Sequence, residues 1–310
     1  MSLPDNIPIV AVVGPTASGK TALAIEIAKR FDGEIIGADS MQIYKNMSIA
    51  SAAPTAEEKG DIPHHLFEFL DTCEKFSVAE YVALATKKVA EVTARGKLPV
   101  LVGGTGLYVD SFLENLKFSA EENTDEVREK LEKEAAELGT AALLERLKEI
   151  DPEAASKLHE NDKKRIIRAL EVYEIHGVTP TEMNLRSKSE PSPYKSIYIG
   201  TNYKDRETLY KRIKKRVYMM LEQGLLQEAE KSYKTLGSTA VQAIGHKEFY
   251  PYFDGEISKD EAIESLIRST RRYAKRQLTW FRRNENINWI YMDECDNPIE
   301  KAANIVKENL

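Results

Sequence analysis

The residues best able to do chemistry form a short run near the start of the chain. It reads Gly14-Pro15-Thr16-Ala17-Ser18-Gly19-Lys20-Thr21 and follows the apolar segment 9–13. This is the G-x-x-x-x-G-K-T spacing of a P-loop, in which backbone N–H groups surround a phosphate, the lysine reaches the terminal phosphates and the threonine holds Mg²⁺. The amphipathic segment 22–29 predicts a helix whose positive end strengthens this site. We therefore expect a bound polyphosphate and Mg²⁺ on Thr21.

Two further predicted strands end on residues that could face the same ligand. Segment 33–39 reads as a short buried strand that ends on Asp39, and 98–102 leads into Gly103-Gly104-Thr105-Gly106. Ligands of open α/β sheets bind beyond the carboxyl ends of the strands, so Asp39 should face the P-loop crevice. The glycines allow close backbone approach and Thr105 supplies a hydroxyl. A helix N-cap at Asp39 and a plain tight turn at 103–106 are the alternatives.

Two other polar groups are interpreted as structural. His64-His65 lacks a third metal ligand at suitable spacing nearby. Asp293-Glu294 follows a predicted strand at 287–293 and resembles a Walker B acid pair, but a solvated strand end is the preferred interpretation.

Composition is that of an ordinary globular protein. The chain has 310 residues, 30% of them charged, a net charge of −6 and two cysteines that form no C-x-x-C pair. These features argue against a disulfide framework and a zinc site. No apolar run is long enough to span a membrane and no signal-peptide pattern opens the sequence, so we expect a cytoplasmic protein without a membrane partner.

The pattern of predicted elements places two domains on one chain. Strand and helix signals alternate over 1–118 and 195–310, which predicts an α/β core with a parallel sheet. Residues 119–194 carry charged helical periodicity without strand signals and predict an all-helical insertion. In its helix 163–176, Ile166, Leu170 and Tyr173 should lie on the buried side. Further helices are predicted at 77–95, 205–222, 225–236 and 258–284.

Basic residues gather on three of these helices, although the chain is acidic overall. Helix 258–284 carries seven cations on one side and no acid between 265 and 284. Such a stripe repels itself unless a polyanion covers it, so the pattern indicates a nucleic-acid surface. The seven are Arg268, Arg271, Arg272, Lys275, Arg276, Arg282 and Arg283; the other clusters are Lys204, Arg206, Lys211, Arg212, Lys214, Lys215 and Arg216, and Lys163, Lys164, Arg165 and Arg168.

Taken together, the motifs resemble those of the tRNA dimethylallyltransferase (tRNA isopentenyltransferase) family over nearly the whole chain. The chain lacks the zinc finger of eukaryotic relatives and so resembles the bacterial form. One departure is His246, where the family usually has tyrosine. The matching motifs are the P-loop, Asp39-Ser40-Met41-Gln42-Ile43-Tyr44, Pro63-His64-His65-Leu66, 102–108, 161–172, 242–248 and 274–282.

The resemblance implies a P-loop kinase-like fold and transfer of a dimethylallyl group from its diphosphate to N6 of adenosine 37 in tRNA. The implied catalytic residues are Asp39 as general base, Thr105, Lys20 and Arg216, with residues 14–21 holding the diphosphate. The implied partner is the anticodon stem-loop, and we expect a monomer. Implied tRNA contacts are Asp39, Ser40, Met41, Gln42, Thr105, Arg128, Lys164, Arg165, Ile166, Ile167, Arg168, Gln242, Ala243, Ile244, Gly245, His246, Lys247, Lys275, Arg276, Gln277, Leu278, Thr279, Trp280, Phe281 and Arg282.

Three other functions stay open at this point. One is an adenylate isopentenyltransferase that makes free cytokinin nucleotides, but the basic helices argue against it. A small-molecule kinase shares the P-loop and the acid on the next strand. A non-enzymatic RNA-binding module would have the same basic surfaces but would catalyse no reaction.

Overall fold

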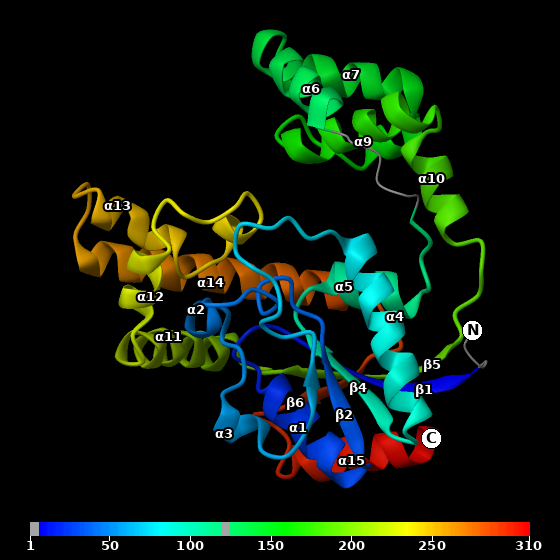
Figure 1. Ribbon diagram of the computed structural model, residues 1–310, viewed down its shortest axis with the longest axis vertical. Helices are drawn as coiled ribbons and strands as arrows, with labels where there is room; N and C mark the ends of the chain where they lie inside the picture. Colours follow the sequence, from blue (N-terminus) through cyan, green and yellow to red (C-terminus); the bar gives the residue numbers. More distant parts are fainter. Residues whose placement is uncertain (1–5, 119–124) are drawn as a thin grey trace. The chain divides into compact units, whose positions relative to one another are not determined.

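The computed structural model describes residues 6–118 and 125–310, which form two compact units (Figure 1). Unit 1 runs up to Leu113 and resumes at Ser192, and unit 2 is Glu114–Pro191. Both boundaries fall a few residues before those predicted from the sequence, and the predicted insertion start at 119 lies outside the described residues. No helix in the described part of the chain is long and apolar enough to cross a membrane.

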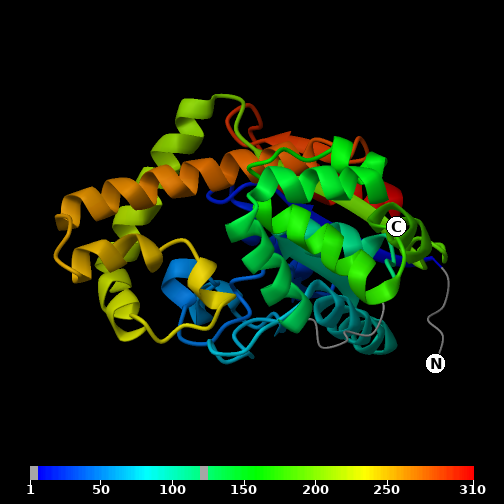
Figure 2. The ribbon, with the colours of Figure 1, turned by 90° about the horizontal axis from the view of Figure 1, so that it is seen from above.

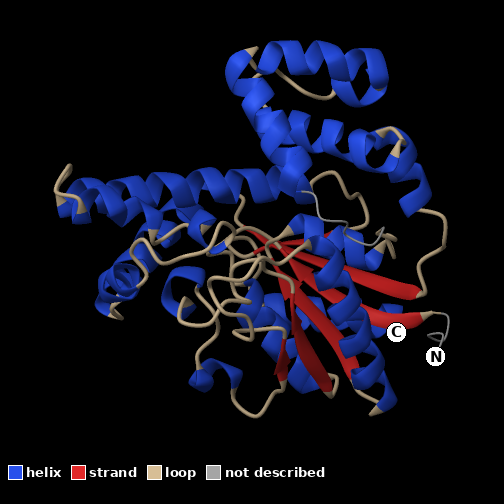
Figure 3. Cartoon of the chain, turned by 45° about the horizontal axis from the view of Figure 1, so that its top comes forward, coloured by secondary structure: helices blue, strands red, loops and turns tan. Residues whose placement is uncertain are grey.

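Unit 1 is built on a six-stranded parallel sheet with the order β3-β2-β4-β1-β5-β6. The central strands β1, β2 and β4 are almost entirely buried and contain many β-branched residues, as expected for a parallel sheet covered on both faces. Figure 3 shows the strands in red among the helices. Their bounds are β1 Ile7–Val13, β2 Gly33–Gly37, β3 His64–His65, β4 Leu98–Gly103, β5 Tyr194–Asn202 and β6 Asn288–Tyr291.

Helices cover the sheet on both faces. On one face, α1 (Lys20–Arg30) and α15 (Pro298–Asn309) pack against Val10, Val12 and Ile199. On the other, α4 (Val78–Ala94) and α5 (Gly106–Leu113) pack against Ile9 and Ala11. The predicted α/β P-loop fold is therefore confirmed, whereas α15 was not predicted.

The strand order fixes where a ligand can bind. In the strand order, β2 and β4 lie on one side of β1, and β5 lies on its other side. The connection from β1 to β2 therefore runs in one direction across the sheet, and the connection from β4 to β5 runs in the opposite direction. Adjacent strands with connections in opposite directions leave a crevice beyond their carboxyl ends. Val13 of β1 pairs with Gly103 of β4, so the P-loop and the glycine-rich turn leave the sheet side by side at this switch point.

A helical layer completes unit 1. Its longest element, α14 (Lys259–Phe281), packs against α11 (Arg206–Glu222) and is prominent in orange in Figure 2. The predicted helix 225–236 was too long: α12 ends at Lys231, and Lys234 has a left-handed backbone that a helix cannot continue through. The short elements are α2 Ser48–Ser51, α3 Ala56–Lys59, α12 Leu225–Lys231, η1 Ala240–Gln242, η2 Lys247–Phe249 and α13 Tyr250–Phe253.

The regular structure in the described residues of unit 2 is helical. Its core contains Leu131, Leu147, Ile166 and Leu170. Tyr173, predicted on the buried side, is instead exposed, because the covered stripe of α9 is centred on Ile166, Ile167, Leu170 and Glu171. The helices are α6 Asp125–Glu137, α7 Thr140–Ile150, α8 Pro152–Ser156, α9 Lys163–His176 and α10 Pro180–Ser187.

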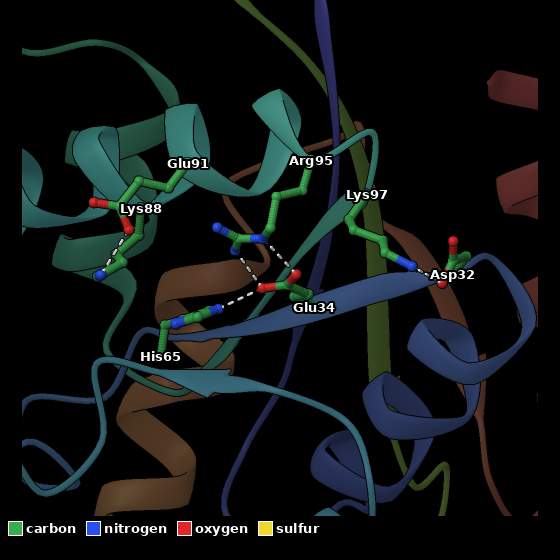
Figure 4. A network of polar contacts seen from close by, with 7 residues as sticks. All are labelled: Asp32, Glu34, His65, Lys88, Glu91, Arg95 and Lys97. Atoms are coloured by element: carbon green, nitrogen blue, oxygen red, sulfur yellow. Dashed lines mark hydrogen bonds and ion pairs between the residues drawn. The ribbon is translucent and has the colours of Figure 1, made fainter.

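A buried acid ties β2 to α4 and β3 (Figure 4). The Glu34 carboxylate accepts hydrogen bonds from Arg95 Nε at 3.0 Å and Nη2 at 2.6 Å, and His65 Nε2 lies 2.6 Å away. The hydrogen bonds from Arg95 lower the pKa of Glu34. This network gives His65 a structural role, as the sequence indicated.

Replacing Arg95 with methionine should destabilise the fold by about 2 to 3 kcal/mol at pH 7, because a buried carboxylate loses its main partner. Arg95 is half-exposed, so the larger cost of breaking a fully buried pair does not apply. A lowered carboxyl pKa contributes stability at high pH that is lost as the group protonates. The difference in urea midpoint between wild type and variant should thus shrink as pH falls below 4.5. An undiminished difference at pH 3 would contradict this explanation.

Candidate active site

The P-loop has the backbone that its glycines were predicted to allow. Gly14 and Gly19 have φ of 146° and 92°, and Gly19 is the N-cap of α1. A Cβ on Gly14 would lie 2.4 Å from the carbonyl oxygen of Thr201 on β5. Ser18 Oγ donates to Pro15 O at 2.8 Å and lies 2.6 Å from Thr201 Oγ1. The loop is therefore fixed against the end of β5.

Two arginines of α11 reach the same loop. Arg212 Nε donates to Ala17 O at 3.1 Å. Arg216 Nη1 approaches Thr16 Oγ1 at 3.4 Å, and its Nη2 approaches Ala52 O at 3.5 Å. Burial lowers the pKa of Arg216, but guanidinium stays protonated in proteins. The structure thus brings Arg216, one of the implied catalytic residues, next to the P-loop.

Asp39 and Thr105 form the opposite wall. Thr105 N–H donates to Ala38 O at 3.2 Å, and Thr105 Oγ1 accepts from Ser40 N–H at 2.9 Å. A Cβ on Gly103 would lie 2.0 Å from Ala38 O, so only glycine permits this approach of β4 to the end of β2. Asp39 Oδ1 accepts the Met41 N–H at 3.0 Å. The glycine-rich turn is therefore a close packing device as well as part of the candidate site.

The charges of the two walls act on one another. Burial lowers the pKa of Lys20 to about 8, with the negative charge of Asp39 opposing this shift and Arg216 adding to it. Burial raises the pKa of Tyr81, Tyr108 and Tyr273. The negative charge of Asp39 adds a smaller contribution to each of these shifts. The charge of Asp39 therefore acts on Lys20 and on three tyrosines, two of which, Tyr81 and Tyr108, are buried in the core.

Sequence reasoning missed Tyr81 as a neighbour of the site. It is fully buried on α4, and its ring stacks on Tyr108 at 4.2 Å between centroids. Its hydroxyl is buried and makes no hydrogen bond with the described residues. In the sequence Tyr81 is one apolar-face residue among several, so no local signal could have separated it from the core.

The lowered pKa of Lys20 predicts how pyrophosphate affinity depends on pH. In the role predicted for Lys20 the protonated amine would bind the anion, so affinity should fall as pH rises through about 8, where free Lys20 loses its proton. Titration calorimetry with magnesium pyrophosphate from pH 6.5 to 9.5 measures this. Pyrophosphate itself also titrates, and this affects both proteins equally. The ratio of the wild-type association constant to that of Lys20→Met is therefore free of the ligand's own titration. A ratio that is constant across this range would contradict a titrating Lys20.

The basic face of α14 is largely exposed. Arg268, Arg272, Lys275, Arg276, Arg282 and Arg283 are exposed, whereas Arg271 is partly buried with its guanidinium 4.9 Å from the Tyr210 ring centre. Arg283 lies over Trp280 at 4.0 Å, and Trp280 Nε1 donates to Asp110 at 2.6 Å. Four cations on α14, and Arg282 and Arg283 directly after its end at Phe281, thus face solvent, as predicted.

His246 is enclosed rather than exposed. Its Nδ1 lies 2.9 Å from Ser232 Oγ, and its Nε2 lies 2.9 Å from Glu228 Oε1. The same carboxylate accepts the N–H groups of Ile49 and Ala50 at 3.0 and 2.9 Å. The departure from tyrosine therefore places a histidine in a buried polar network that joins α12 to α2.

In unit 2, Lys164, Arg165 and Arg168 lie on the exposed side of α9. Arg128 donates to both oxygens of Glu171 at 3.0 and 2.9 Å, and this glutamate is fully buried. Arg128 is therefore engaged within unit 2.

The side chains implied as tRNA contacts differ widely in exposure. Those that are buried cannot present their side chains to RNA in this conformation. The exposed ones are Lys164, Arg165, Arg168, Gln242, Lys275, Arg276, Thr279 and Arg282; the partly buried ones are Asp39, Ser40, Met41, Gln42, Thr105, Arg128, Ile244, Lys247, Leu278 and Trp280; the buried ones are Ile166, Ile167, Ala243, Gly245, His246, Gln277 and Phe281.

Asp293 has a structural role, as the sequence favoured. Its carboxylate accepts the N–H groups of Lys204 and Asp205 at 2.8 and 2.9 Å, at the residues that precede α11. Glu294 lies 3.6 Å from Lys204 in an exposed ion pair.

Comparisons with known proteins agree on one family. The model of a family described as IPP transferase matches residues 42–284, and one described as isopentenyl transferase matches residues 7–66. The tRNA dimethylallyltransferase of Acetivibrio thermocellus is 51% identical over 304 residues, which are 97% of this chain and 96% of that protein. That of Caldanaerobacter subterraneus is 47% identical over 96% of each chain.

Solved structures give the same result. The tRNA isopentenylpyrophosphate transferase of Bacillus halodurans aligns with a TM-score of 0.71 and 41% identity over 98% of both chains. A eukaryotic dimethylallyltransferase solved in snapshots of its action on tRNA aligns with a TM-score of 0.78 and 27% identity, over 96% of this chain and 77% of that one. The chain belongs to the tRNA dimethylallyltransferase family.

Proposed function

We propose that this chain transfers a dimethylallyl group from dimethylallyl diphosphate to N6 of adenosine 37 in a tRNA anticodon loop and releases diphosphate. The observation that carries the proposal is the set of side chains gathered beyond the strand ends at the switch point of the sheet. A cationic P-loop with Lys20 and Arg216 lies on one side, and Asp39 and Thr105 lie on the other. A diphosphate fits the cationic side, and a nucleophile that must lose a proton fits the side that carries the Asp39 carboxylate.

In the proposed step, the N6 lone pair attacks C1 of the dimethylallyl group while the bond from C1 to the diphosphate oxygen breaks. The bonding electrons pass to the leaving diphosphate, and the N6 proton passes to the Asp39 carboxylate. Charge grows on the leaving group in the transition state, so Lys20, Arg216 and the P-loop N–H groups stabilise it. One Asp39 oxygen already accepts the Met41 N–H, which orients the carboxylate.

Thr105 is assigned to the bridging oxygen of the diphosphate. In the structure the Thr105 hydroxyl donates a hydrogen bond to Ser40 Oγ at 3.2 Å. The Ser40 N–H holds Thr105 Oγ1 as an acceptor at 2.9 Å, so the hydroxyl can turn its proton to a ligand without losing its position.

The residues at the loop fit a magnesium ion. Mg²⁺ prefers a few protein oxygens together with phosphate and water oxygens, and Thr21 supplies a hydroxyl at the start of α1, directly after Lys20. No cluster of three or more acidic, histidine or cysteine side chains for a metal occurs in the described residues, which suits an ion held mainly by the substrate. When bound, Mg²⁺ would neutralise part of the diphosphate charge.

We assign the exposed cations of α14 and α9 to the tRNA backbone. Four exposed cations on α14, with Arg282 and Arg283 directly after it, match a polyanion better than a small nucleotide. Because the reaction needs access to N6, adenosine 37 should leave its stack before it enters the crevice. We propose a monomer as the active form.

The decisive test uses radiolabelled dimethylallyl diphosphate with unmodified tRNA, followed by nucleoside analysis. We expect label in N6-dimethylallyl adenosine. Label in free adenine nucleotides would favour the adenylate enzyme, and a γ-phosphoryl product from ATP a kinase. Salt titration of tRNA affinity is a second measurement, because backbone contacts make affinity fall steeply with salt.

A further inference from the structure

Gln277 lies inside unit 1 although it sits among the basic residues of α14. Its side chain is only 4% exposed. Its neighbours Lys275 and Arg276 are exposed, so the amide of Gln277 faces the inside of unit 1. The family resemblance lists Gln277 with the tRNA contacts, but its burial leaves it no surface to offer RNA.

The Gln277 amide makes one hydrogen bond to the P-loop and one to the glycine-rich turn. Its Oε1 accepts the Thr16 N–H of the P-loop at 2.8 Å, and its Nε2 donates to Gly104 O at 3.0 Å. The two partners fix the orientation of the amide, since an N–H needs the oxygen and a carbonyl needs the nitrogen. Gln277 thus bridges the loop that follows β1 and the turn that follows β4.

The surrounding packing leaves this bridge little freedom. A Cβ on Gly104 would lie 2.1 Å from Gln277 Nε2, so glycine is needed for the amide to approach. One side chain of α14 therefore holds Thr16 and Gly104 together.

We propose that Gln277 is a positioning residue that fixes the P-loop relative to the Gly104–Thr105 turn. The inference rests on the proposed function, in which the loop holds the diphosphate and Thr105 meets its bridging oxygen. Small displacements of reacting groups have large effects on rate, so a loose loop would lower turnover even with its own phosphate-binding groups intact.

Two variants separate positioning from RNA contact. Gln277→Met keeps the length of the side chain and removes both hydrogen bonds. Its kcat should fall about 10- to 100-fold, with the KM for tRNA within about twofold of wild type. Glu264→Gln, on the exposed side of the same helix, is the matched control and should retain wild-type kinetics. A raised tRNA KM with unchanged kcat in Gln277→Met would overturn the proposal in favour of RNA contact.

The variant Gln277→Glu should have a pH-dependent kcat, which a simple loss of packing would not produce. When protonated, the new carboxyl has the donor and acceptor pattern of the amide and can make both bonds; when ionised, it repels Gly104 O. The ratio of its kcat to that of wild type should rise as pH is lowered from 8 to 6, whereas the ratio for Gln277→Met should stay flat. A flat ratio for both variants would overturn the proposal.

Binding of magnesium pyrophosphate, measured without tRNA, keeps the test independent of the proposed reaction. If Gln277 positions the loop, Gln277→Met should bind pyrophosphate at least about fivefold more weakly than Glu264→Gln. Equal affinity would count against the proposal. Wild-type enzyme that binds pyrophosphate but does not prenylate tRNA would refute the function and leave this comparison valid. If Gln277→Met does not fold, Gln277→Glu at pH 6 and 8 provides the same comparison.

Discussion

Replacing Asp39 with asparagine is expected to lower the turnover number at least about 100-fold, the low end for loss of a general base. An asparagine oxygen can still accept the Met41 N–H, so the local turn should persist. The exocyclic amine of adenosine is a poor nucleophile, and without a carboxylate its proton has no acceptor in the transition state. Single-turnover prenylation with saturating tRNA and dimethylallyl diphosphate measures this step directly.

The control for this variant is Asp71→Asn. Asp71 is an exposed carboxylate paired with Lys45 at 3.1 Å and should retain full turnover. Affinity for tRNA, measured by filter binding, should be the same for wild type and Asp39→Asn, because the exposed cations that we assign to RNA are unchanged. A loss of tRNA affinity with little change in the single-turnover rate would assign Asp39 to binding instead of proton transfer.

Replacing Lys20 with methionine is expected to lower kcat about 10²- to 10³-fold at pH 7, the usual cost of removing one donor to a developing negative charge. Lys20 is fully buried and interacts electrostatically with both Asp39 and Arg216, so its charge acts at low dielectric. Methionine has a similar length and apolar stem, which keeps the packing. The loss should extend to pyrophosphate affinity, measured by calorimetry without tRNA.

Lys29→Met is the matched control for Lys20→Met. Lys29 lies on the same helix α1 but is exposed and paired with Glu26 at 2.8 Å, so it should leave both quantities unchanged. A less than threefold effect of Lys20→Met on kcat would exclude the lysine from stabilising the leaving group. The anion would then be held by the N–H groups and Arg216 alone.

Much of the site could be predicted because its parts are local in sequence. The P-loop needs eight consecutive residues between a strand and a helix, and the structure has this arrangement between β1 and α1. Asp39 follows the end of β2, as the sequence predicted, because a short apolar strand precedes it and parallel strands direct their carboxyl ends to one edge. The exposed side of α14 followed from helical periodicity alone.

Other features could not be predicted because they depend on contacts between distant segments. The sequence gives no sign that α15 would cover the face of the sheet beside α1, or that α12 would end at Lys231. The buried set in α9 was misjudged at Tyr173, since the partner helices decide which part of an apolar stripe is covered. His246 was marked only as a departure from a pattern, and its buried partners Ser232 and Glu228 emerged from the fold.

The sequence by itself determined the phosphate-binding loop, the acid beside it, the basic helices and the family. Each of these depends on residue types within one segment, where chain connectivity already fixes the spacing. The tertiary structure decided which of those residues meet. Thr16 and Gln277 are 261 positions apart, and their hydrogen bond exists only because α14 packs across the ends of β1 and β4. Hydrogen bonds of buried side chains are satisfied across the whole fold, so no local pattern encodes them.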